Sequence, residues 1–357
     1  MKAQWIADLY SDYLLASFGA TTATGLSELL EGDLSHAQVT RYLAGTKKTA
    51  SDLWRTVKAF VREVQSEAGV LIIDDSIEEK PYTDENDLVC WHYDHSKDRL
   101  LKGINFLTAL YSSRGVSVLV GFHLVAKTEQ YLDPKTQKEK RRSPVSKNEV
   151  GRDLIKQAVK NRIPFRFVLF DVWFASAENM VFLKQQVHRD FICPLKTNRK
   201  VALSKADKQQ GRYVRVDALD LEAHATREIY LEGVDFPLVL VKQIFTNEEG
   251  SSGIRYLVSS DTTLAFDAIT TTYHKRWGVE CYHKSLKQNV SVAKSPTQTV
   301  TTQTNHFFAA LCGFIKLEKL KIKTHLNHFT LKSKLYLNAL HSAFATLRTL
   351  TTGQVPA

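Results

Sequence analysis

The chain has 357 residues, of which 43% are hydrophobic and 24% are charged, the proportions of an ordinary globular protein large enough for one core with appended modules. Its 48 lysines and arginines outnumber 38 aspartates and glutamates, and the formal net charge of +10 favours a polyanionic partner such as nucleic acid. The four cysteines lack C-x-x-C pairing, which argues against a disulfide framework or a zinc ribbon, and no run of 18 apolar residues suggests a membrane span, so we expect a soluble, cytoplasmic protein.

The first 67 residues are predicted to be helical. One helical run ends near Leu30, and a second is opened by Ser35 as N-cap, with Gln38 completing a capping box. This is the outline of a helix-turn-helix, although a plain helical hairpin fits the pattern equally well. Basic residues that follow favour the first reading: Lys47, Lys48, Arg55, Lys58 and Arg62. We therefore predict a DNA-binding domain over 1–67, with Arg41 as a candidate contact.

A catalytic core is predicted to begin at residue 68 and to continue to 197. Its first strand, VLIIDDS, is a β-branched run that ends in Asp74 and Asp75. The runs 103–113 and 115–127 predict a hairpin. A helix over 148–160 then leads into FRFVLFD, a buried strand that ends in Asp171. Further on, the sequence predicts a helix near 176–187 and a fifth strand, FICPLKT.

A basic segment, PKTQKEKRRSPVSK, lies between the hairpin and the strand of Asp171. Its polar composition predicts a loop. Because it precedes that strand, we interpret Lys140, Arg141 and Arg142 as contacts for DNA phosphates, with a solvated loop as the alternative.

The remainder is predicted to contain a β-rich insertion over 198–262, a second part of the core over 263–300, and C-terminal helices over 301–357. Within the core segment, TTYHKRWGVECYHKSLKQ is predicted to form one helix. At 3.6 residues per turn, Tyr273, Arg276, Glu280 and Lys287 would share one face. A solvated stripe of ion pairs would give this pattern, and so would a groove that binds a ligand.

Three acids could meet in such a core: Asp74, Asp171 and Glu280. A mixed sheet can place the first and fourth strands side by side, with the helix of Glu280 packed across their ends. Clustered carboxylates without histidine or cysteine suit Mg²⁺ or Mn²⁺. Two such ions can assist in-line phosphoryl displacement, and in a basic protein this chemistry predicts a phosphodiester enzyme.

These residues resemble a known family. The order Asp, Asp, Glu, with the third acid inside Tyr273-x2-Arg276-x3-Glu280-x6-Lys287, is similar to the DDE transposases of bacterial insertion sequences that carry a Y-R-E-K signature. The resemblance covers about 69–323. It implies an α/β fold, an RNase H-like mixed sheet flanked by helices, with a β-rich insertion and helical N- and C-terminal parts.

The resemblance also implies roles for individual residues. Asp74, Asp171 and Glu280 would be the catalytic ligands of two Mg²⁺ ions, or of Mn²⁺, with Asp75 as a substitute for Asp74; we prefer Asp74 because alternation along the strand points Asp75 to the other face. Residues 190–270 contain no tryptophan, so the insertion supplies none for base stacking. The candidate DNA contacts are Tyr273, Arg276, Trp277, Lys284, Lys287, Arg41, Lys140, Arg141 and Arg142.

The resulting hypothesis is a transposase that binds terminal inverted repeats and carries out metal-dependent strand cleavage and strand transfer. By resemblance, its partners would be double-stranded DNA and a second copy on paired ends, in the bacterial cytoplasm and associated with the nucleoid. An RNase H-like nuclease or resolvase that cuts without joining is one alternative. A DNA-binding regulator is another, and it would leave the three acids unexplained.

Overall fold

The computed structural model describes residues 2–94, 97–134, 136–246 and 250–352. They divide into two compact units. The first unit comprises Met1–Thr56, Ile77–Asn105 and Cys281–Ala357, and the second comprises Val57–Ser76 and Phe106–Glu280. Each unit therefore combines segments that are distant in sequence.

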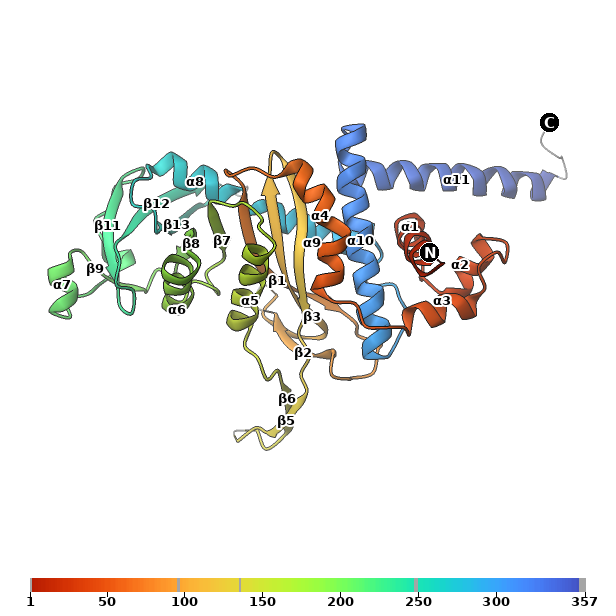
Figure 1. Cartoon of the computed structure of the whole chain (residues 1–357), viewed down its shortest axis with the longest axis horizontal. Helices are drawn as coiled ribbons and strands as arrows, with labels where there is room; N and C mark the ends of the chain where they lie inside the picture. The colour runs from red at the N-terminus through yellow and green to blue at the C-terminus, as the bar shows by residue number, and fades with distance from the viewer. Residues whose placement is uncertain (1, 95–96, 135, 247–249, 353–357) are drawn as a thin grey trace. The chain divides into compact units, whose positions relative to one another are not determined.

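The second unit is built on a mixed sheet, as expected. Its strands follow the order β10-β9-β11-β12-β13-β8-β7-β1-β3, and β4 pairs with β3. The strands from β11 to β3 are labelled in Figure 1. Pairing is parallel between β1 and β7 and between β7 and β8, and antiparallel between β13 and β8. The strands are β1 (Val70–Glu79), β3 (Arg99–Ser113), β4 (Val116–Leu124), β7 (Phe167–Phe170), β8 (Asp190–Leu195), β9 (Lys200–Ala202), β10 (Val214–Arg215), β11 (Thr226–Leu231), β12 (Leu238–Thr246) and β13 (Ser252–Ser259); β1 and β3 also have residues in the first unit.

The predicted hairpin is formed by β3 and β4, joined by Arg114 and Gly115. Both residues have positive φ, 51° and 76°. This is the conformation that a two-residue hairpin turn needs to match the twist of its strands. Gly115 adopts this conformation without steric cost, whereas Arg114 adopts it at a cost because of its Cβ.

The basic segment after this hairpin is not a simple loop, so that prediction was wrong. Strands β5 (Glu129–Leu132) and β6 (Glu139–Arg142) form a separate antiparallel ribbon. Arg142 pairs with Glu129 at 2.8 Å and lies over the ring of Tyr131. Such cross-strand charge and aromatic pairs stabilise a ribbon, and composition alone does not reveal them.

Helices flank the sheet of the second unit. Helix α5 begins with a capping box, in which the Ser146 hydroxyl accepts from the backbone N–H of Glu149 and the Glu149 carboxylate accepts from that of Ser146. Helix α5 spans Lys147–Lys160. The other helices are α6 (Ala177–Val181), the π-helix η1 (Phe182–Val187), α7 (Lys205–Gln209), the 3₁₀ turn η2 (Val216–Ala218) and α8 (Phe266–His274).

The first unit is mainly helical. The predicted cap of its third helix is confirmed, since Ser35 and Gln38 form the capping box. Asn305, buried in α10, accepts from the backbone N–H of Lys48 at 2.9 Å and donates to the Leu43 carbonyl at 2.8 Å. Its elements are α1 (Lys2–Ala16), α2 (Ala23–Leu29), α3 (His36–Leu43), β2 (Val89–Asp94), α10 (Val300–Thr324) and α11 (His328–Thr352); α4 (Ala50–Val64) and α9 (Trp277–Asn289) run through both units.

Within the described ranges, we find no helix with the length and apolar character that crossing a bilayer requires. All four cysteines lie in the described ranges, and no disulfide joins any two of them.

Candidate active site

Two of the predicted acids lie side by side in the second unit. Strands β1 and β7 are parallel, and their last paired residues are Ile73 and Phe170. The next residue in each segment is an acid, Asp74 within β1 and Asp171 directly after β7. Pairing between the two strands stops here while β1 continues to Glu79, so the two acids follow the last paired residues and lie side by side. The strands that the sequence predicted to be neighbours are therefore adjacent.

Asp171 is held by the turn that follows it. Its Oδ1 accepts from the backbone N–H of Trp173 at 3.0 Å and from that of Phe174 at 3.3 Å. An aspartate that bonds to the backbone two and three residues ahead fixes a tight turn. Burial raises the pKa of Asp171, and Arg276 opposes that rise.

The helix of the third acid departs from the prediction of one continuous helix. Helix α8 ends at His274, and α9 begins at Trp277. Between them the backbone hydrogen bonds join residues three apart instead of four. The N–H of Arg276 donates to the carbonyl of Tyr273, and the N–H of Val279 donates to the carbonyl of Arg276. These tighter turns change the rotation per residue, so the single face calculated from 3.6 residues per turn does not exist across the break.

The break separates the signature residues into different environments. Tyr273 is buried, and its hydroxyl donates to the Phe170 carbonyl at 3.4 Å. Arg276 reaches two acids: it donates to Asp74 Oδ2 at 3.1 Å and to Glu280 Oε1 at 3.0 Å. The Arg276 side chain is only 16% exposed. A solvated stripe of ion pairs therefore does not describe this part of the chain.

Asp75 has a different partner from Asp74. The ammonium of Lys147, the first residue of α5, lies 2.6 Å from Asp75 Oδ2. The same ammonium lies 5.8 Å from the centre of the half-exposed Trp173 ring. The neighbouring carboxylates of β1 thus pair with different cations, Asp75 with Lys147 of α5 and Asp74 with Arg276 of the turn between α8 and α9.

More acidic than basic side chains surround Asp74: Asp171 and Asp75 are negative, and Arg276 is positive. Burial raises the pKa of Asp74 to about 7; Asp171 and Asp75 add to the rise, and Arg276 opposes it. Desolvation and like charges both disfavour an ionised carboxylate, so a bound cation would be stabilised there.

The donor chemistry suits a hard divalent ion, because all of the ligands on offer are carboxylate oxygens. In the ranges that the structure covers, however, no three acidic, histidine or cysteine side chains are grouped closely enough to hold a metal. Asp74 and Glu280 instead share the Arg276 guanidinium.

Comparison with known proteins identifies the family. Residues 2–221 match the family described as DDE superfamily endonuclease. The chain belongs to the DDE endonuclease superfamily. Residues 143–313 also match the transposase DDE domain, which confirms the resemblance to DDE transposases and the RNase H-like α/β fold expected from it. The protein is therefore a nuclease of the transposase type that acts on DNA, in a family whose members use divalent metal ions.

Other comparisons add little to this result. No curated protein matches the chain. Among solved structures, endonuclease V from Bacillus subtilis matches with 10% identity over 67% of this chain and 94% of its own, at a TM-score of 0.25. A superposition of that quality carries no comparison of sites.

The other candidate DNA contacts of this DDE enzyme are dispersed. Trp277 in the second unit is 58% exposed. In the first unit, Lys284 lies over the Phe329 ring, and the Lys287 ammonium donates to the Ile77 carbonyl at 2.9 Å. Three further candidates belong to β6, the second strand of the ribbon: Lys140, Arg141 and Arg142.

Sequence reasoning missed a basic hollow beside Asp171. It measures about 650 Å³ and includes Trp173 in its lining. Three basic side chains contribute to it, Lys196, Arg199 and Lys200, all of them in the segment KTNRK that directly follows β8. The sequence signal that could have revealed this hollow is the presence of three basic residues within five positions after the strand. Their number suits a nucleic-acid backbone.

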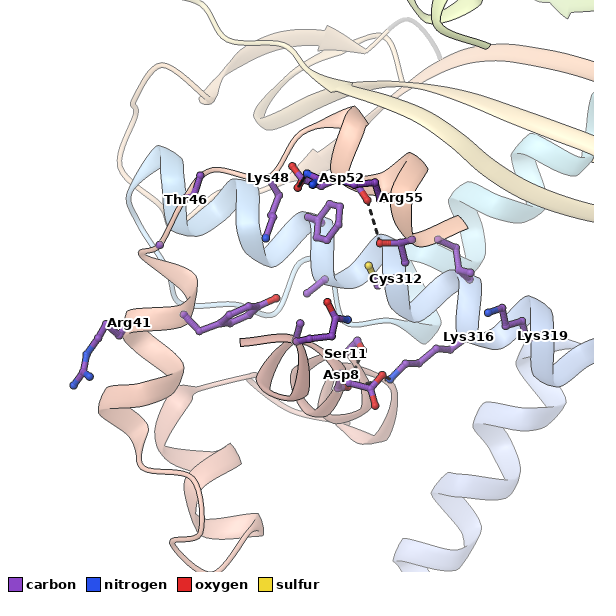
Figure 2. A pocket seen from close by; sticks show the side chains of 18 residues that line it. Asp8, Ser11, Arg41, Thr46, Lys48, Asp52, Arg55, Cys312, Lys316 and Lys319 are labelled. Carbon is purple, nitrogen blue, oxygen red and sulfur yellow. Dashed lines mark hydrogen bonds and ion pairs between the residues drawn. The ribbon is translucent and has the colours of Figure 1, made fainter. Parts of the chain in front are cut away.

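A second hollow, of about 660 Å³, lies among α1, α3, α4 and α10 of the first unit (Figure 2). Two of its cations have acidic partners: Lys316 lies 2.7 Å from both Asp8 and Asp12, and an ion pair joins Arg55 to Asp52. Arg41, the predicted DNA contact, points away from the other labelled side chains (Figure 2). Arg41 nevertheless belongs to the lining of this hollow.

Proposed function

We propose that this protein is the transposase of a bacterial insertion sequence, which binds the terminal inverted repeats, cuts the DNA ends and joins them to a target. The observation that carries the proposal is the adjacency of Asp74 and Asp171, directly after the last paired residues of two parallel strands, with Glu280 connected to Asp74 through Arg276. The Arg276 guanidinium bonds to two of these acids and opposes the rise in the pKa of the third, which supports one shared reaction centre.

The proposed ligands of the divalent ions are Asp74, Asp171 and Glu280. Two Mg²⁺ ions, replaceable by Mn²⁺, would supply an activated attacking oxygen and a stabilised leaving oxygen. The protein's own contribution is to hold Asp171 by its turn and Asp74 within strand β1. Asp75 is held away by Lys147, so we propose it only as a substitute ligand.

Arg276 would first neutralise the acids and then bind a DNA phosphate. A guanidinium suits both partners, because its planar donors match carboxylate and phosphate alike. Trp277 and Lys284 would contact the DNA near the cut. Tyr273 is buried, and Lys287 donates to a backbone carbonyl. These two residues would therefore contribute to DNA binding by positioning their neighbours.

DNA would be bound by surfaces beyond the reaction centre. We propose that 1–67 reads the inverted repeat through Arg41, and that the ribbon, through Lys140, Arg141 and Arg142, contacts phosphates. The remaining divisions are proposed as the core over 68–197 and 263–300, the insertion over 198–262 and the C-terminal helices over 301–357. Two copies would act on paired ends in the bacterial cytoplasm, associated with the nucleoid.

The test is cleavage and joining of a labelled transposon end in Mg²⁺. Asp74→Ala, Asp171→Ala and Glu280→Ala should each abolish cleavage and retain end binding, because they remove metal ligands and leave the DNA-contacting residues in place. Lys156→Ala, at a solvent-facing ion pair on α5, is the matched control and should cleave normally.

The joining step separates the proposal from its alternative. If 3′-OH ends are transferred into a second duplex, the protein is a transposase. A protein that cuts its ends with the three acids but never joins them would be a nuclease or resolvase. Full-rate cleavage by any of the three alanine variants would refute the site itself.

A further inference from the structure

Strand β2 carries two large aromatic side chains that are open to solvent. Trp91 is 51% exposed and Tyr93 is 46% exposed, although tryptophan is highly buried on average in folded proteins. Cys90 and His92, which alternate with them along the strand, are buried. This alternation is that of a strand with one face on the core and the other in water. Trp91 and Tyr93 therefore project from the same exposed face.

The neighbouring strand completes this face. Strand β2 pairs antiparallel with β3, which sets Lys102 opposite Trp91 and Leu100 opposite Tyr93. Residues directly opposite each other project from the same side of a sheet, and Leu100 is 62% exposed. We call the four side chains Trp91, Tyr93, Leu100 and Lys102 the β2–β3 face. All four belong to the first unit.

The β2–β3 face has a fixed framework. Each of the residues of β2, Val89–Asp94, pairs with a residue of β3. Before the strand, Asn86 Oδ1 accepts from the backbone N–H of Val89 at 2.8 Å, and Asn86 Nδ2 donates to the carbonyl of Gln298 at 2.9 Å. At the other end, the Tyr93 hydroxyl donates to Asp98. Rings held on a fixed strand lose little conformational freedom when they bind a ligand.

Aromatic rings beside a cation are the combination that binds unpaired nucleic-acid bases. The rings stack on the faces of the bases, and the cation attracts the phosphates between them. Arg99, near the end of the face, is paired with Glu79 at 3.5 Å. Lys102, in contrast, forms no ion pair with any acidic residue that the structure describes. Its ammonium is therefore available to a phosphate.

The spacing of the rings favours a single strand over a duplex. Side chains two residues apart on a β-strand are separated by about 7 Å, roughly twice the distance of about 3.4 Å between successive bases of one duplex strand. This spacing leaves room for one base beside each ring. In an intact duplex the faces of the bases are covered by their neighbours, so rings on a protein surface cannot stack on them.

We propose that the β2–β3 face binds unpaired DNA, with one base stacked on Trp91, another on Tyr93, and a phosphate at Lys102. Endonuclease cleavage supplies such a ligand, since it leaves strand ends whose bases can separate from the duplex. The inference rests on the proposed function only in taking DNA as the polymer. Its test needs neither cleavage nor joining, so a failure of the joining assay would leave it standing.

The test is binding of the full chain to labelled oligonucleotides, measured by fluorescence anisotropy in EDTA so that no strand is cut. The probes are a dT strand of about ten nucleotides, an abasic strand of the same length, and a duplex. The abasic strand keeps the phosphates and lacks the bases. Wild type should bind the dT strand at least about tenfold more tightly than the abasic strand, because only the dT strand offers bases for stacking.

Substitutions on the β2–β3 face should affect these probes differently. Trp91→Ala and Tyr93→Ala should each weaken binding of the dT strand about tenfold and leave the affinities for the abasic strand and the duplex unchanged. Trp91→Phe keeps a ring and should retain most of the affinity. Lys102→Ala should weaken binding of both single strands equally, because it removes a phosphate contact.

The matched control is Tyr82→Ala, which removes a fully exposed aromatic ring outside β2 and should bind all three probes as wild type does. Circular dichroism checks that every variant is folded.

Two outcomes would overturn the proposal. Equal affinity of wild type for the dT and abasic strands would show that no base stacks on the protein. Wild-type affinity for the dT strand in a variant with both Trp91→Ala and Tyr93→Ala would place single-strand binding elsewhere. The β2–β3 face would then be a surface for a protein partner, for which exposed aromatic residues are also typical.

Discussion

Arg276→Ala should destabilise the metal-free protein and strengthen its response to Mg²⁺. The guanidinium lies 3.1 Å from Asp74, with side chains 16% and 10% exposed, so their ion pair is largely buried. Removing one partner of a buried pair costs about 3–5 kcal/mol, because the other charge is left uncompensated. The pair with Glu280 adds little, since that carboxylate is 44% exposed. At roughly 2–4 °C per kcal/mol for a domain of this size, the melting temperature in EDTA should fall by about 10 °C.

The metal response is the decisive measurement. A divalent ion would replace the missing charge, whereas in the wild-type protein it must displace the guanidinium. The rise in melting temperature between EDTA and 10 mM Mg²⁺ at pH 8, measured by differential scanning fluorimetry, should therefore be larger for Arg276→Ala than for wild type. Lys275→Ala, an exposed neighbour, is the control and should behave as wild type. An unchanged melting temperature in EDTA, or a Mg²⁺ response no larger than that of wild type, would refute this account of Arg276.

Three further predictions concern other parts of the molecule. Asp75→Ala should reduce Mg²⁺-dependent end cleavage far less than Asp74→Ala does; the reverse order in a single-turnover assay would exchange their roles. Trp173→Ala should weaken DNA binding about tenfold, because the indole would stack on a base. Arg199→Ala should reduce the slope of log affinity against log salt concentration by about one. Binding isotherms at several salt concentrations that match those of wild type would exclude the basic hollow as a DNA-binding surface. Burial lowers the pKa of His306 to about 4, below its value in the unfolded chain, so the folded state binds fewer protons. The free energy of unfolding should therefore fall by up to about 3 kcal/mol as pH falls from about 6.5 to 4. Urea titrations across this pH range should show a smaller loss for His306→Gln, and an equal loss would assign the acid sensitivity to other groups.

The strands of the site were predictable because their signals are local. VLIIDDS and FRFVLFD are short apolar runs that end in acids, and the structure pairs them in parallel with Ile73 opposite Phe170. The capping box at Ser35 was predictable for the same reason, since a cap depends on residues three apart. The choice of which strands become neighbours followed from the order of elements.

Features set by tertiary packing were not predictable. The break before Trp277 replaces a helical face with a turn, and Tyr273 goes into the core although its spacing matched the signature. Strand β2 (Val89–Asp94) was missed because its VCWHYD sequence mixes apolar and polar residues; it is stabilised by pairing with β3. The bond from Arg276 to Asp74 joins positions about two hundred residues apart, and no local pattern encodes it.

The register of β1 and β7 also bears on when the reaction centre forms. The two strands that carry Asp74 and Asp171 are separated by about a hundred residues of chain, whereas β3 and β4 are joined by two. Closing a long loop costs more conformational entropy than closing a hairpin, so local pairs form sooner. We therefore expect the β3–β4 hairpin to fold early and the pair of aspartates to meet late. A chain still emerging from the ribosome would then carry the carboxylates without the capacity to cut DNA, and that capacity would arise only once the two distant strands have docked.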